Sequence, residues 1–290
     1  MASCSEPVSR TWVGTQLWLW PNLLSLDAPL VAVLWQILFA RCFHASPDSL
    51  PAVLLVLAVW LIYAADRALD AWSGNGRLPR HEFYRRHWKS VLPLWVTVLA
   101  FTTWLASAYL PAVLFHRGLA LLAAIGIYFG IVHLAPERIR RVWPKEAAVA
   151  VLFALGASIA TWTKVQSTAD TLSILLFSCL CWINCVAIEH WENERWQSAG
   201  WSRQAGDEPK EVGAFLGLPI GVAALFVGVA ALLFLSEHRP VIGGAETASA
   251  LAFVWLDRAR RRLSADALRV LADVALLSPI FFLPLAGMRF

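Results

Sequence analysis

Long apolar segments, separated by short groups of proline, glycine and charged residues, recur along the whole 290-residue chain. Each segment is close to the roughly 20 residues that an α-helix needs to cross the hydrocarbon core of a bilayer. The nine segments cover residues 23–43, 49–70, 90–110, 112–134, 144–162, 170–190, 212–235, 240–257 and 265–287. The apolar–polar alternation of barrel strands does not occur, and backbone groups in lipid must be satisfied within their own segment. The pattern predicts an all-α, polytopic membrane protein with about nine transmembrane helices in a single domain, 1–290.

Composition supports this class and argues against two others. Hydrophobic residues make up 59% of the chain and charged residues only 15%, far from the usual composition of soluble domains. The net charge of +4 is small and scattered, so we expect no nucleic-acid partner. The five cysteines show no CxxC spacing, so neither a disulfide framework nor a zinc site is predicted.

The distribution of basic residues predicts the orientation in the membrane. If the N-terminus is cytoplasmic, eighteen Lys and Arg residues fall on the cytoplasmic side of the nine segments and five on the opposite side. The positive-inside rule then favours a cytoplasmic N-terminus and a C-terminus on the opposite side. The longest cytoplasmic loops, about 71–89 and 191–211, follow the second and sixth segments, so we expect the chemistry on that side.

Acidic residues gather at the cytoplasmic ends of the second and sixth segments. Asp66 and Asp70 are four residues apart, so on a helix both carboxylates emerge on one face. At the matching end of the sixth segment lie Asn184, Glu189 and Glu192. Carboxylate and amide oxygens suit Mg²⁺, which usually binds through a few carboxylates together with substrate phosphates.

A diphosphate substrate with an apolar tail would fit this combination. Basic side chains near the acidic groups can neutralise phosphate charge, and arginine can do so with two hydrogen bonds. These basic residues are Arg67, Arg138, Arg140, Arg141 and Lys145. The apolar, tryptophan-rich segments would enclose the tail.

Four segments resemble the UbiA superfamily of intramembrane prenyltransferases. "ADRALD", 65–70, resembles the second half of the family's first motif, NDxxDRxxD, and "NCVAIEHWE", 184–192, is similar to its second, NDxxxxxxD. "ERIRRVWPKE", 137–146, resembles the segment KRxTxxPQ between the fourth and fifth helices. "LWLWPNLLS", 17–25, resembles the start of the first helix, with Pro21 and Asn22.

The resemblance implies a nine-helix bundle that transfers an isoprenoid chain from its diphosphate to a lipophilic acceptor. It implies that Asp66, Asp70, Asn184 and Glu192 organise Mg²⁺, with Glu189 standing in for a missing carboxylate. It also implies that the diphosphate and its chain are bound by a further set of residues: Asn22, Arg67, Arg138, Arg141 and Lys145. Asp66, Asp70 and Glu192 are the expected catalytic residues.

The resemblance implies a divergent member of the superfamily, because the motifs are incomplete. The Asn and Asp that open the first motif correspond to Ile62 and Tyr63, and the early Asp of the second motif corresponds to Cys185. Several carboxylates that would hold two Mg²⁺ ions are therefore replaced by other residue types.

Other interpretations of the same residues remain open. Charged residues often end a membrane span simply because water begins there. A UbiA-like bundle that binds a lipid or pigment without catalysis would tolerate the missing carboxylates, and a small transporter would require charged residues near mid-bilayer. A histidine-bound metal is disfavoured because the HxxxH and HxxHH spacings of membrane di-iron enzymes are missing. Arg269 and Asp273, four residues apart in the last segment, are predicted to pair along their helix.

Overall fold

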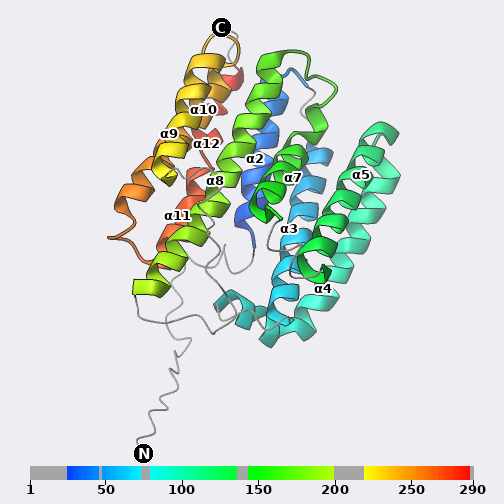
Figure 1. Ribbon diagram of the computed structural model, residues 1–290. Coiled ribbons are helices and arrows are strands. Elements are labelled where there is room, and N and C mark those ends of the chain that lie inside the picture. Colours follow the sequence, from blue (N-terminus) through cyan, green and yellow to red (C-terminus); the bar gives the residue numbers. More distant parts are fainter. Residues whose placement is uncertain (1–24, 46–47, 73–78, 136–142, 199–218, 288–290) are drawn as a thin grey trace, which may run out of the picture.

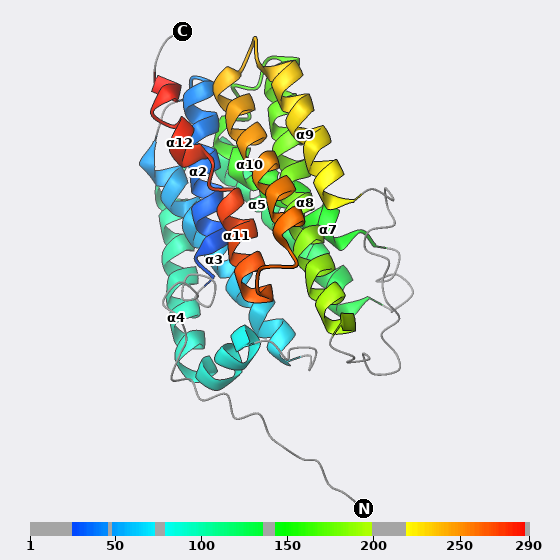
Figure 2. The same ribbon diagram turned by 90° about the vertical axis from the view of Figure 1, so that its left-hand side faces the viewer.

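The computed structural model describes residues 25–45, 48–72, 79–135, 143–198 and 219–287, and each regular element in these ranges is a helix (Figures 1 and 2). The elements are α2 (Asp27–Cys42), α3 (Ser49–Trp72), α4 (Pro79–Tyr109), α5 (Ala112–Phe129), η2 (Gly130–Leu134), α7 (Lys145–Ser158), η3 (Ile159–Thr161), α8 (Thr168–Ser198), α9 (Ile220–Leu235), α10 (Pro240–Ala259), α11 (Ala265–Ala275), α12 (Pro279–Phe282) and η4 (Leu285–Gly287). Of these, η2 is a π-helical turn and η3 and η4 are 3₁₀ turns.

Four described helical stretches are long and apolar enough to cross a membrane. They are Ser49–Leu69, Val91–Tyr109, Ala112–Leu134 and Thr168–Glu194, and the apolar helix α9 is shorter. The described chain is all-helical, as the pattern predicts, and these stretches indicate a membrane protein. The nine-span arrangement stays a prediction.

Two helices extend into segments that we expected to be loops. Helix α4 begins at Pro79, within the expected loop 71–89, and α8 continues to Ser198, within the expected loop 191–211. Both extensions carry many charged residues. The length of the apolar segment therefore predicted the membrane span in each case, but each helix continues for two to three turns beyond its apolar part.

The last predicted segment, 265–287, is broken into α11, α12 and η4. Pro279 cannot donate a backbone hydrogen bond and interrupts a continuing helix. Side chains from two other helices satisfy carbonyls freed at the break: Trp35 Nε1 donates to the Leu276 carbonyl at 2.9 Å, and Ser249 Oγ donates to the Ala275 carbonyl at 2.7 Å. Such replacement partners are what allow an irregular backbone inside an apolar bundle.

Helix α2 lies at the centre of the bundle. It packs against α3, α7, α10, α11 and α12, and α8 packs against α7, α9, α10 and α11. Helix α11 therefore contacts both α2 and α8, and Figure 2 shows it between them. This arrangement brings together helices that are more than two hundred residues apart in the chain.

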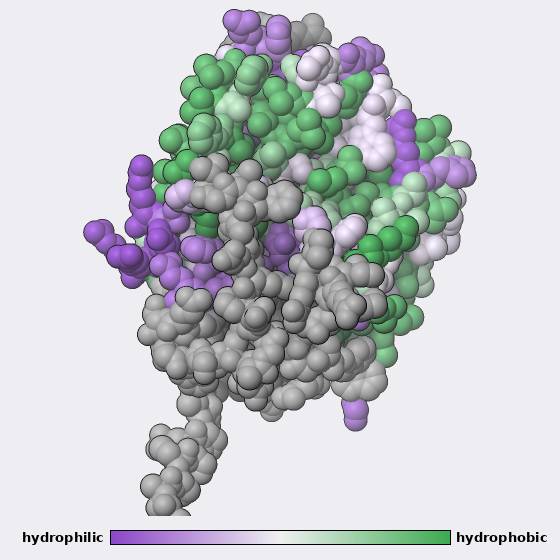
Figure 3. All heavy atoms as spheres, in the orientation of Figure 1, coloured by the Kyte–Doolittle hydropathy of each residue, from purple (hydrophilic) through white to green (hydrophobic). Residues whose placement is uncertain are grey.

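Helices α4 and α5 form an outer side of the molecule. None of the described residues in their apolar stretches, Val91–Tyr109 and Ala112–Leu134, is buried inside the protein. Large apolar side chains such as Trp104 and Ile127 are more than half exposed. Figure 3 shows hydrophobic residues over much of the part of this face that is not grey, with hydrophilic residues at the top, at the lower left and at the right-hand edge. A surface of this extent on a helical bundle is typical of contact with lipid.

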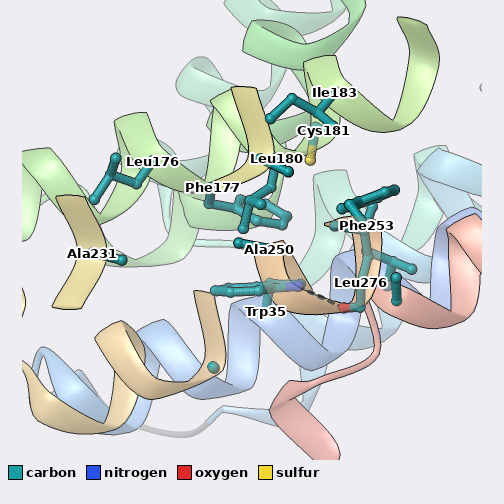
Figure 4. Close-up of a cluster of buried hydrophobic side chains, with 14 of the residues drawn as sticks. Trp35, Leu176, Phe177, Leu180, Cys181, Ile183, Ala231, Ala250, Phe253 and Leu276 are labelled. Atoms are coloured by element: carbon teal, nitrogen blue, oxygen red, sulfur yellow. Dashed lines mark hydrogen bonds between the residues drawn. The ribbon is translucent and has the colours of Figure 1, made fainter. Parts of the chain in front are cut away.

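The core joins α2, α8 and α10 through large side chains. Trp35 stacks on Phe177 with ring centroids 4.2 Å apart, and Phe253 and Leu180 lie in the same cluster (Figure 4). The Trp35 hydrogen bond to the Leu276 carbonyl also appears in this view. The core therefore fixes α2 relative to the end of α11, which matters for the polar residues described next.

Candidate functional site

The motif-bearing end of α3 turns two neighbouring side chains in different directions. Arg67 is buried, with 8% of its surface exposed, and its Nη2 lies 3.9 Å from Oδ2 of Asp27 at the first residue of α2. Asp66 is more exposed, with 42% of its side chain accessible, and its Oδ1 lies 3.7 Å from Nε2 of His133 in η2. The backbone of Asp70 belongs to α3, and its side chain lies outside the described residues.

The second motif, on α8, meets α11. Nδ2 of Asn184 donates a hydrogen bond to Oδ1 of Asp273 at 3.1 Å. The carboxyl group of Asp273 is also hydrogen-bonded to that of Asp27. Oδ1 of Asn184 is buried and accepts no hydrogen bond from the described part of the chain. Helix α8 is thereby connected to α2 as well as to α11.

These contacts form one polar cluster, consisting of Asp27, Arg67, Asn184 and Asp273. Its members come from α2, α3, α8 and α11, so the helices that carry the two predicted motifs are linked inside the bundle. Two carboxyls in direct contact hold one proton or one cation between them, because two full negative charges at that distance repel strongly. Arg67 offsets one negative charge.

The two glutamates of the second motif are paired with basic residues from other helices. Oε2 of Glu189 lies 3.7 Å from Nζ of Lys145 at the start of α7. Glu192 forms a close ion pair with Arg269 of α11. Lys145 also lies 3.3 Å from its neighbour Glu146. Both glutamates are therefore neutralised across helix interfaces.

The predicted pairing of Arg269 with Asp273 along α11 is wrong. In the structure both side chains reach α8 instead: Arg269 binds Glu192, and Asp273 accepts from Asn184. The physical reason is that α11 packs directly against α8, so an interhelical partner is available to each group. Interhelical pairing satisfies four polar groups, whereas pairing along α11 would satisfy two.

Several predicted site residues cannot be placed in this geometry. Asn22, Arg138 and Arg141 lie outside the described residues. Within the described ranges, no group of three or more His, Cys, Asp or Glu side chains is arranged to hold a metal ion. The site residues of both motifs therefore stay predictions, of which the structure brings Arg67 and Asn184 into one cluster and pairs Glu189 and Glu192 with cations.

The cluster contains two residues that the sequence argument did not place in the site. Asp27 lies in the first apolar segment, and Asp273 was assigned to a structural pair. A signal was nevertheless present, because an ionisable residue inside an apolar segment is costly and is a candidate functional residue for that reason alone. Which partners such residues find depends on helix packing, and a single segment does not contain that information.

The donor atoms of this site show whether it is chemically suited to Mg²⁺. The available groups are carboxylate and amide oxygens, the donor type that Mg²⁺ prefers. Oδ1 of Asn184 is a buried oxygen that lacks a hydrogen-bond donor among the described residues, which is the condition expected of an atom meant for a cation. The donor set is therefore compatible with Mg²⁺.

The sequence was compared with protein-family models, with curated proteins and with solved structures, and no match was found in any of the three comparisons.

Proposed function

We propose that this chain is a UbiA-like intramembrane prenyltransferase that moves an isoprenoid chain from its diphosphate to a lipophilic acceptor with the help of Mg²⁺. The observation that supports the proposal is the polar cluster. Through Asp27 and Asp273 it connects Arg67 of the first predicted motif with Asn184 of the second. Two acidic motifs that are far apart in sequence would have to act on one ligand in this reaction.

The residues that would hold Mg²⁺ are Asn184, Glu189 and Glu192 from α8 with Asp66 and Asp70 from α3. A divalent cation at this position would stabilise the negative charge that develops on the departing diphosphate. Asn184 contributes an oxygen that is already without a hydrogen-bond donor in the described chain. The carboxylates contribute charge as well as oxygen donors.

Ligand binding would change the partners of the charged residues of the site. Glu189 and Glu192 are now bound by Lys145 and Arg269. If Glu189 and Glu192 held a cation, Lys145 and Arg269 would be able to bind phosphate oxygens, Arg269 with two parallel hydrogen bonds. A Mg²⁺–diphosphate ligand would bring a positive partner for the carboxylates and a negative partner for the two basic side chains together.

The apolar surroundings have a chemical role in the same proposal. When diphosphate leaves, the allylic fragment becomes cation-like, and water would trap it. An enclosed apolar site excludes water from the reacting carbon and strengthens electrostatic interactions around it. A helical bundle in a membrane supplies such surroundings for a substrate whose tail is itself apolar.

The test is an assay of the purified full chain in detergent with labelled isoprenoid diphosphates. We expect Mg²⁺-dependent release of diphosphate, reduced at least about tenfold by Asp66→Asn and by Glu192→Gln, in line with the loss of a metal-binding group. Glu194→Gln is the matched control, because Glu194 lies on the same helix and binds Arg260 at 3.0 Å. If all four proteins behave alike, the site assignment fails.

A second candidate function, binding of a lipid or pigment without catalysis, is supported by the ion pairs themselves. Glu189–Lys145 and Glu192–Arg269 neutralise the motif carboxylates without a metal ion. The same assay separates the two functions. A binding protein would retain an isoprenoid diphosphate or a neutral isoprenoid independently of Mg²⁺ and would release no diphosphate.

A further inference from the structure

The two motifs lack carboxylates at positions that lie near each other in the structure. Tyr63 stands where the first motif has its early Asp, and Cys185 stands where the second has its own. The side chains of Tyr63 and Cys185 are close enough to interact electrostatically. The two positions therefore lie in the same part of the bundle.

Two carboxylates from other helices lie at this place. Tyr63 is close enough to interact electrostatically with both Asp27 and Asp273, and Cys185 interacts with Asp273 in the same way. Asp27 comes from the first turn of α2 and Asp273 from the third turn of α11. Neither helix carries one of the two motifs. The packing of α2 and α11 therefore brings these carboxyl groups close to Tyr63 and Cys185.

The arrangement of the two carboxyls indicates a shared positive partner. They are in hydrogen-bonding contact, and Arg67, 3.9 Å from Asp27, provides one positive charge. With both carboxyls ionised the cluster would carry one excess negative charge. A divalent cation between them would satisfy both groups at once and would leave one positive charge, the sign that a diphosphate ligand requires.

A separate observation points to a ligand at the same position. Nδ2 of Asn184 donates to Asp273, which fixes the orientation of the amide group. Oδ1 is buried and has no hydrogen-bond donor among the described residues. A buried amide oxygen in this condition destabilises the fold unless a donor or cation reaches it.

We propose that Asp27 and Asp273 replace the carboxylates missing from the two motifs and bind Mg²⁺ together with Oδ1 of Asn184. This inference rests on the proposed function, since it assigns further metal-binding residues to the same site. In this assignment the motif carboxylates Glu189 and Glu192, with their partners Lys145 and Arg269, would serve the diphosphate part of the ligand. The site combines oxygen donors from α2, α8 and α11.

The experiment measures metal binding directly, without turnover. Mn²⁺ serves as a paramagnetic probe for the Mg²⁺ site, and its binding to the purified full chain is followed by electron paramagnetic resonance with and without inorganic diphosphate. We expect Asp27→Asn and Asp273→Asn each to weaken Mn²⁺ binding at least about tenfold. Asp266→Asn is the matched control, because Asp266 lies on α11 with Asp273, is exposed, and receives the same substitution.

The outcomes separate this inference from the proposed function. If Asp27→Asn and Asp273→Asn bind Mn²⁺ as tightly as wild type while Glu192→Gln binds it more weakly, the replacement inference is wrong and the proposed function stands. If wild type binds no Mn²⁺ with or without diphosphate, both are overturned. A tenfold loss confined to the two cluster variants, with Asp266→Asn unchanged, supports the inference.

A second measurement on the wild-type chain avoids the risk that a variant fails to fold. Fe²⁺ at the Mg²⁺ site, with ascorbate and oxygen, generates oxidants that modify the nearest residues, which mass spectrometry of peptides can locate. We expect modification in peptides around residues 27, 184 and 273, abolished by excess Mg²⁺. Modification restricted to peptides of α3 and the end of α8 would overturn the assignment of Asp27 and Asp273.

Discussion

Close packing of α9 against α10 predicts opposite effects for two identical substitutions. Gly243 in α10 lies so near α9 that an added Cβ would be 2.9 Å from Cβ of Leu235 and 3.0 Å from the carbonyl oxygen of Ala231. Favourable contacts between carbon atoms are about 3.5–4.0 Å long. Because one of the two neighbours is backbone, Gly243→Ala requires the helices to move apart.

The expected magnitude follows from two opposing contributions. Overpacking of a close interface typically costs about 1–3 kcal/mol, and alanine replaces glycine in a helix with a gain of about 1 kcal/mol. Gly126 in α5 is the matched control, since an added Cβ there meets no atom within 4 Å. Gly126→Ala should show only the gain in helix stability. The difference in the free energy of unfolding between the two variants therefore measures the cost of overpacking, about 1–3 kcal/mol.

The assay is unfolding of the purified full chain in mixed micelles, followed by tryptophan fluorescence. We expect Gly243→Ala to be less stable than Gly126→Ala, with Gly126→Ala equal to or above wild type. Equal stability of the two variants would show that α9 and α10 are not held at the distance that Gly243 requires. It would also show that the small residue Gly243 does not set this helix contact, although small residues often do so between membrane helices.

Three further predictions use the same preparation. Asp257→Ala should lower the free energy of unfolding by about 1–2 kcal/mol, because Asp257 accepts a hydrogen bond from the Gly221 backbone N–H at 3.1 Å and so caps α9. The unfolding assay described above measures this change. Glu246→Met should raise the free energy of unfolding by about 1–3 kcal/mol, because both carboxyl oxygens are buried and have no hydrogen bonds from the described residues. If the variant lost ligand binding without this gain in stability, the transporter hypothesis would be favoured. Reporters fused to the two ends should place the N-terminus in the cytoplasm and the C-terminus on the opposite side, and the reverse arrangement would contradict the charge argument.

Helix positions were largely predictable where apolar length and helix-breaking residues coincide. The predicted segment 240–257 corresponds to α10, Pro240–Ala259, and Pro240 stands at the start of the helix, where proline is tolerated. The break after Ala275 was not predicted, although Pro279 is visible in the sequence. Whether a proline bends a helix or ends it depends on the partners that accept the freed carbonyls, and those partners, Trp35 and Ser249, are remote in the chain.

The candidate site was predictable only in part, for a related reason. Glu189 and Glu192 could be selected because charged groups at the end of an apolar segment stand out. Their actual partners, Lys145 and Arg269, come from other helices, and so do the contacts of Asp27 and Asp273. Periodicity places a side chain on a face of its own helix, but the helix that covers this face is decided by the packing of the whole bundle.

The broken end of α11 and the polar cluster depend on each other. Trp35 of α2 holds the Leu276 carbonyl just beyond α11, and one helical turn earlier Asp273 contacts both Asp27 of α2 and Asn184 of α8. Apolar packing alone would allow α11 to rotate or slide between its neighbours, because lipid tails are as apolar as the helix surface. Polar contacts on two sides remove that freedom, since any other register would leave buried charged groups without partners. The charged groups that make the site a candidate for cation and diphosphate binding therefore also determine how α2, α8 and α11 fit together.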